Sequence, residues 1–116
     1  MKVQLSNYFT GDYYTVLSSY VKRIQYILNN YDVAIFMARK AICLYQALVK
    51  NGELYETSCR VISSRVVDYN SMDNLRGIHI AVIDDVVIKG ESLNRVAEEL
   101  SLHQLQADYY VAVCER

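Results

Sequence analysis

The chain has 116 residues, of which 53% are hydrophobic and 22% are charged, and this fits one small globular domain with a single core. Its net charge of −1 argues against binding to nucleic acid or to an anionic membrane surface. The longest apolar run, residues 33–38, is too short to cross a bilayer, and no apolar segment typical of a signal peptide follows Lys2. We therefore expect a soluble cytoplasmic protein.

Hydrophobic periodicity predicts a leading helix and then alternating strands and helices. Apolar residues spaced three and four apart mark the helices, and short, nearly continuous apolar runs mark the strands. In chain order we predict a helix over 13–29, a strand over 33–37, a helix over 42–50, a strand near 59–62, a polar loop over 64–74, a strand over 78–83, a helix over 92–102 and a strand over 109–114.

This order of elements predicts an α/β fold: a doubly wound, three-layer parallel sheet of about four strands with right-handed crossovers. We expect one domain, with a helical segment over 1–31 and the core over 32–116. In such sheets ligands bind outside the carboxyl ends of the strands, where the strand order reverses. The loops over 38–41 and 86–91 meet there if the first and third strands are neighbours.

The cysteines and tyrosines are the unusual side chains of this composition. Cys43, Cys59 and Cys114 are odd in number, far apart and set among apolar residues, so we expect buried thiols rather than a disulfide or a metal site. The chain also has 11 tyrosines and no proline. Tyrosine rings are common at helix faces and subunit contacts, so a homodimer or larger assembly is one expectation.

Residues 78–93, IHIAVIDDVVIKGESL, hold the most informative local pattern. A β-branched apolar strand leads into Asp84 and Asp85, which are costly to bury and should emerge at the end of the strand. A short loop with Gly90 follows, and Ser92 stands where the N-cap of the next helix belongs. Free backbone N–H groups and the positive end of the helix dipole would make this bend an anion pocket.

This segment resembles the ribose-phosphate motif of the type I phosphoribosyltransferases. Asp84 and Asp85 match the acidic pair that, in the family, holds the ribose hydroxyls of phosphoribosyl pyrophosphate during catalysis. Carboxylates accept hydrogen bonds from vicinal hydroxyls, whereas they would repel a phosphate. The family's 5′-phosphate loop corresponds here to Ile88, Lys89, Gly90, Glu91 and Ser92.

Two further loops extend the resemblance to about residues 32–114. Arg39 matches the basic residue of the family's diphosphate loop, but Lys40 and Ala41 stand where glycines are usual. Either Arg39 and Lys40 supply charge in place of backbone amides, or they are two solvated cations before a helix. Arg65 lies in the counterpart of the family's mobile catalytic loop, where it would either close over a diphosphate or stay exposed.

The sequence also departs from the family pattern. Ile88 stands where many nucleobase enzymes of the family carry an acid, so it excludes acid–base catalysis at that position. Lys89 replaces a usual Thr or Ser, and Glu91 would repel a phosphate unless Lys89 offsets its charge. Only residues 1–12 or the first helix are available for base recognition, so we expect no full hood subdomain. Beyond the fourth strand, the fold either lacks a fifth strand, continues in a longer protein, or is covered by a partner.

The resemblance implies a phosphoribosyltransferase-like protein that binds phosphoribosyl pyrophosphate or a nucleotide and transfers phosphoribosyl to a nitrogen acceptor. Mg²⁺ would be held mainly by the oxygens of the substrate, with no ligand directly from the protein. The alternative is a non-catalytic regulatory or nucleotide-sensing module that keeps the ribose-phosphate pocket. A receiver-type signalling domain is disfavoured, because only residues 86–116 follow Asp85.

Overall fold

Four parallel strands form the centre of the fold in this computed structural model, which describes residues 13–72, 77–87 and 91–114. The strand order is β2-β1-β3-β4, and every pairing is parallel. The elements are α1 (Tyr13–Asn30), β1 (Val33–Phe36), α2 (Lys40–Lys50), β2 (Arg60–Ser63), the 3₁₀ turn η2 (Asn70–Met72), β3 (Ile80–Val87), α3 (Glu91–Leu102) and β4 (Ala107–Cys114). The predicted order of helices and strands is confirmed.

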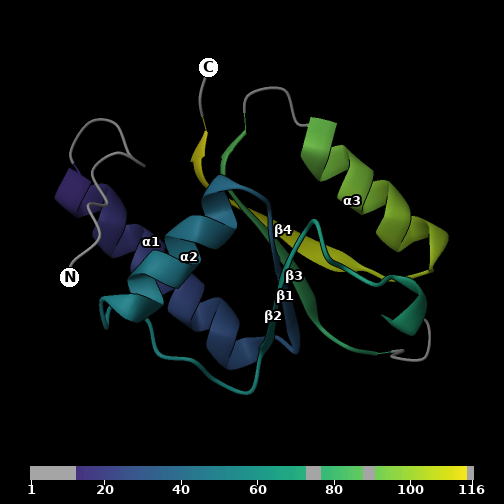
Figure 1. Cartoon of the computed structure of the whole chain (residues 1–116), viewed down its shortest axis with the longest axis horizontal. Coiled ribbons are helices and arrows are strands. Elements are labelled where there is room, and N and C mark those ends of the chain that lie inside the picture. Colours follow the sequence, from purple (N-terminus) through teal and green to yellow (C-terminus); the bar gives the residue numbers. More distant parts are fainter. Residues whose placement is uncertain (1–12, 73–76, 88–90, 115–116) are drawn as a thin grey trace.

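The chain winds outward from the centre of the sheet in two directions. From β1 it passes through α2 to β2, and from β3 it passes through α3 to β4. Figure 1 shows α1 and α2 together on one side of the sheet and α3 on the other. This is the predicted doubly wound α/β arrangement of three layers, and the strand order reverses between β1 and β3.

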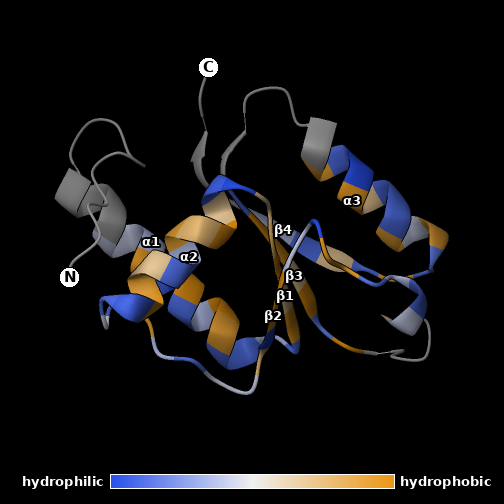
Figure 2. Ribbon diagram, viewed as in Figure 1, coloured by the Kyte–Doolittle hydropathy of each residue, from blue (hydrophilic) through white to orange (hydrophobic). Residues whose placement is uncertain are grey.

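The sequence of β1 is a continuous apolar run because this strand lies in the core. All four of its residues are buried, because helices cover both faces of the sheet. Phe36 packs against Tyr45 of α2, with ring centroids 4.7 Å apart. On α1, Ile24, Ile27 and Leu28 are buried at the spacing of one helix face. Figure 2 shows hydrophobic colouring along the strands and on parts of the helices.

The boundaries of β3 and α3 differ from the prediction in a way that matters for the site. We predicted a strand over 78–83 with the acidic pair beyond it, but β3 runs from Ile80 to Val87 and contains both acids. The pairing with β1 does end at Ile83, whereas β4 supplies partners as far as Val87. Because β4 continues the ladder, β3 does not end where β1 does. The predicted N-cap is also wrong, since α3 already includes Ser92.

Smaller differences affect the cysteines and the other loops. Cys59 is buried as predicted and Cys43 is half-buried, while the side chain of Cys114 lies outside the described part. Burial raises the pKa of the Cys59 thiol to about 11, with a further contribution from the charge of Asp32. Helix α2 begins at Lys40, two residues earlier than predicted, and η2 forms inside the predicted loop. None of the described helices is long and apolar enough to span a bilayer.

Candidate functional site

The loops that follow β1 and β2 are tied together at the carboxyl edge of the sheet. The N–H of Met37 donates to the carbonyl of Ile83 at 2.8 Å, and the N–H of Ser64 donates to the carbonyl of Phe36 at 3.0 Å. The Ser64 hydroxyl in turn accepts from the N–H of Ala38 at 2.8 Å. The backbone after β1 is therefore fixed by β3 on one side and by β2 on the other.

Asp84 lies at this edge, on the side of the sheet that α3 covers. Ile83 is in register with Phe36, which contacts α2, so Ile83 faces the α2 side. Successive residues of a strand point to opposite faces, and Asp84 therefore faces the α3 side. Its side chain is half-buried, and its backbone is in register with Val111 of β4. The backbone of Asp85 belongs to β3, while its side chain lies outside the described part.

A hollow of about 340 Å³ opens on the α3 side of the same edge, and we name it the carboxyl-edge hollow. Arg65 from the loop after β2 and Arg95 from α3 line it, together with the carboxylate of Glu99. Ala38 and Ser64 form part of its wall. Two guanidinium groups against one carboxylate give this hollow a net positive charge, which suits an anion with several oxygens.

The loop that carries Arg65 is packed onto the far end of α3. Tyr69 also lines the carboxyl-edge hollow, and its ring stacks on His103 with centroids 6.0 Å apart and planes 16° apart. Burial raises the pKa of Tyr69, and the charge of Glu99 raises it further. Met72 is buried in the core. These contacts connect the loop to α3, so Arg65 and Arg95 belong to neighbouring walls of one hollow.

Of the predicted site residues that the structure describes, only Arg65 lines the carboxyl-edge hollow, and this residue is exposed. Asp84 lies at the edge and on the side of the sheet where this hollow opens. Arg39 and Lys40, which we predicted to contact diphosphate, are exposed at the start of α2 and do not line that hollow. The peptide bond between Ala38 and Arg39 is cis.

The phosphate loop of the prediction falls largely beyond what the structure describes. Ile88, Lys89 and Gly90 lie outside the described residues. Glu91 and Ser92 form the start of α3, but their side chains are outside the description. Their roles as phosphate ligands stay predictions.

Arg95 and Glu99 are the site residues that sequence reasoning missed. They are four residues apart on α3, where side chains at this spacing lie on one helix face. In the sequence alone, an Arg and a Glu at this spacing look like an ordinary ion pair on a solvent-exposed helix face. Only the position of the loop after β2 turns this face into the wall of a hollow.

A metal centre made by the protein alone is not seen among the described residues, where no three His, Cys, Asp or Glu side chains are grouped to hold an ion. Asp84 could contact a cation only together with oxygens from a ligand. That arrangement suits Mg²⁺, which keeps waters and phosphate ligands. The magnesium prediction stays a prediction.

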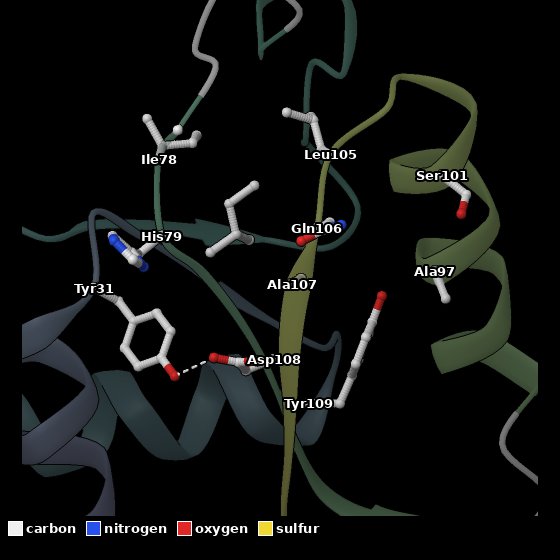
Figure 3. Close-up of a pocket in the computed structure, with 12 residues that line it drawn as sticks. Tyr31, Ile78, His79, Ala97, Ser101, Leu105, Gln106, Ala107, Asp108 and Tyr109 are labelled. Carbon is white, nitrogen blue, oxygen red and sulfur yellow. Dashed lines mark hydrogen bonds between the residues drawn. The ribbon is translucent and has the colours of Figure 1, made fainter.

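A second and larger hollow of about 550 Å³ lies at the opposite end of the strands, and we name it the amino-edge hollow. Figure 3 shows it around the beginnings of β3 and β4, with Tyr31 and Asp108 joined by a hydrogen bond. None of the predicted site residues lines it. Size alone would favour this hollow as the functional site, whereas the topology of a parallel sheet favours the carboxyl edge.

Comparison of the sequence with models of protein families gave no match, and no curated protein matched it significantly.

Proposed function

We propose that the protein binds phosphoribosyl pyrophosphate, or a nucleotide with the same ribose 5-phosphate part, at the carboxyl edge and transfers its phosphoribosyl group to a nitrogen acceptor. The observation that carries this proposal is that Asp84 and the arginine-lined hollow lie at the same edge and on the same side of the sheet, next to the reversal of strand order. Acidic and basic groups at one edge match a ligand with hydroxyls at one end and phosphates at the other.

Each part of the substrate has a chemically suited partner. Asp84 and Asp85 would accept hydrogen bonds from the two ribose hydroxyls and hold the ring in one orientation. Arg65 and Arg95 would pair with diphosphate oxygens through their planar, two-pronged guanidinium groups. The first turn of the 12-residue helix α3, with Ser92, would take the 5′-phosphate through its free N–H groups.

The transfer itself would break the bond between the anomeric carbon and the diphosphate while a bond to the acceptor nitrogen forms. The ribose ring gains positive charge as diphosphate leaves, and carboxylates bound to the ribose hydroxyls would stabilise this charge. Mg²⁺ bound through the substrate would neutralise part of the diphosphate charge. Ile88 cannot donate or accept a proton, so proton transfer with the acceptor would not involve this residue.

One observation favours the second candidate, a module that binds the ligand without turnover. The Ala38 N–H, which would have to face a diphosphate at this loop, already donates to the Ser64 hydroxyl at 2.8 Å. The loop is also short, because α2 begins at Lys40. A loop whose Ala38 amide is already occupied would hold the leaving diphosphate less firmly, and this favours binding without turnover.

Calorimetric titration with phosphoribosyl pyrophosphate and Mg²⁺, followed by an assay for diphosphate release with a panel of nitrogen bases, tests both candidates. We expect binding that falls at least about tenfold in Asp84→Asn and in Asp85→Asn, because a neutral amide is a weaker acceptor for two hydroxyls. Glu53→Gln, an exposed carboxylate after α2, serves as the control and should not change affinity. Binding without release would support the module, and absence of binding would reject both.

A further inference from the structure

The amino-edge hollow contains a carboxylate that is held in place by two tyrosines. The Tyr31 hydroxyl donates to Oδ2 of Asp108 at 2.6 Å. Since a phenol has one proton, the Tyr110 hydroxyl, 2.6 Å away, donates to the Tyr31 oxygen. The rings of Tyr31 and Tyr110 meet edge to face, with centroids 6.0 Å apart. This relay orients Asp108 and leaves further acceptor positions of its carboxylate available to a ligand.

The charge of the hollow is opposite to that of the carboxyl edge. Among the described residues that line it there is no lysine or arginine, and Asp108 is the one acidic side chain. The Asp108 hydrogen bond, then the Tyr110 hydrogen bond, raise the pKa of Tyr31, so the phenol keeps its proton and Asp108 stays the acceptor. An anion placed here would meet this carboxylate with no lysine or arginine among the described lining residues to offset it.

Two helices add to this preference because both end beside the hollow. Helix α1 ends at Asn30, directly before Tyr31, and α3 ends at Leu102, directly after Ser101, another lining residue. The C-terminal end of a helix is the negative end of its dipole. Both helix ends therefore favour a positively charged or N–H-donating ligand.

Apolar side chains form part of the wall of the hollow. Ile78, Ile80 and Leu105 line one part of it, and Ala97 of α3 lines another. The ring of Tyr109 lies between β4 and α3 and is 43% exposed (Figure 3). Asp108 precedes Tyr109 in β4 and points to the other side of the sheet, toward Tyr31 (Figure 3), so the preference of the hollow for a ligand comes from this carboxylate rather than from the apolar side chains.

We propose that the amino-edge hollow is a second binding site, which takes a small ligand with an amidinium, guanidinium or amino group directed at Asp108. The site is separate from the carboxyl edge in position and opposite to it in charge. Its occupation does not depend on the function proposed for the carboxyl edge.

Three ring compounds of equal shape and different charge test this proposal: benzamidine, benzamide and benzoate. Titrated into the full ¹⁵N-labelled chain, benzamidine should shift the amide signals of Ile78, Gln106 and Tyr109, and benzoate should not. Asp108→Asn should weaken benzamidine binding at least about tenfold, since the charge-assisted bond is lost. The same spectra report whether the variant is folded.

Glu53→Gln is the matched control, because it removes one exposed carboxylate that does not line the hollow, and the affinity of this variant for benzamidine should equal that of the wild type. Equal binding of benzoate and benzamidine would overturn the proposal, as would undiminished binding by folded Asp108→Asn. Affinity of Asp108→Asn for phosphoribosyl pyrophosphate should be unchanged, so failure at one site is distinguishable from failure at the other.

Discussion

The two ends of the sheet differ in the charge of their hollows, although the same strands form both. At the carboxyl edge the end of β1 is buried, neighbouring loops are hydrogen-bonded to each other, and two exposed arginines line the hollow. At the amino edge the hollow is wider, most of its polar side chains are exposed, and its fixed charge is negative. Helices that follow parallel strands begin at the carboxyl edge and end at the amino edge. Their dipoles therefore favour anions at the carboxyl edge and cations at the amino edge, as the side chains there also do.

The largest effect we predict concerns the packing beneath the carboxyl edge. Phe36 is fully buried at the end of β1 and contacts Tyr45. Phe36→Ala should lower the free energy of unfolding by about 3–5 kcal/mol, because it removes buried apolar surface and leaves a cavity. Tyr109→Ala, at the amino edge, should cost about 1 kcal/mol, since its ring is 43% exposed. Chemical denaturation of both variants gives the two values.

A similar loss of stability in Phe36→Ala and Tyr109→Ala would contradict the proposed difference in packing between the two edges. It would mean that the amino edge is as tightly packed as the carboxyl edge. The hollow seen there would then not be available to a ligand.

The second prediction concerns the arginines of the carboxyl-edge hollow. Arg65→Gln and Arg95→Gln should each weaken the binding of phosphoribosyl pyrophosphate about tenfold, because each removes a charge-assisted contact with the diphosphate. Benzamidine binding at the other edge should not change. Calorimetry with both ligands on the same protein samples measures the two effects together.

Arg60→Gln is the control, because Arg60 is an exposed arginine at the start of β2, at the opposite end of that strand. If Arg60→Gln weakens binding as much as Arg65→Gln does, the net charge of the protein is responsible rather than the hollow. A decrease confined to Arg65 and Arg95 places the diphosphate in the carboxyl-edge hollow.

The fold was more predictable from sequence than the sites, because its signals are local. The buried run of β1 and the helical spacing of α1 and α3 each indicate their structure within a few residues. The end of β3 was predicted wrongly, since it depends on how far β4 continues the ladder. Local sequence contains no signal for a partner strand of that length.

The sites combine residues that are far apart in the chain. Arg65 was singled out because of its loop, but its approach to Arg95 depends on tertiary packing. Tyr31 and Asp108 are 77 residues apart in sequence, and neither has a neighbouring motif that links it to the other. Tyrosine enrichment was visible in the composition, but its placement in a relay to a carboxylate was not predictable.

The smallest predicted effect tests the tyrosine relay of the amino edge through its dependence on pH. Hydrogen bonds to Asp108 and Tyr110 raise the pKa of Tyr31 in the folded state above the ordinary value of about 10. The contribution of Tyr31 to the free energy of unfolding is therefore fully present below a pH of about 10. It is lost as the pH rises above this value, because the phenol of the unfolded state releases its proton first. Tyr31→Phe removes this contribution, so the difference in unfolding free energy between wild type and variant should shrink between about pH 10 and 11.5.

Burial also raises the pKa of Tyr45, Tyr69 and Tyr109. These tyrosines are present in both proteins, so their contributions cancel in the difference of unfolding free energies. Tyr55→Phe, whose ring is 72% exposed, is the control and should show a difference that does not vary with pH. If the Tyr31→Phe difference is also constant, the phenol does not donate to Asp108 in solution. The carboxylate would then lack the fixed orientation that distinguishes the amino-edge hollow from an ordinary acidic surface.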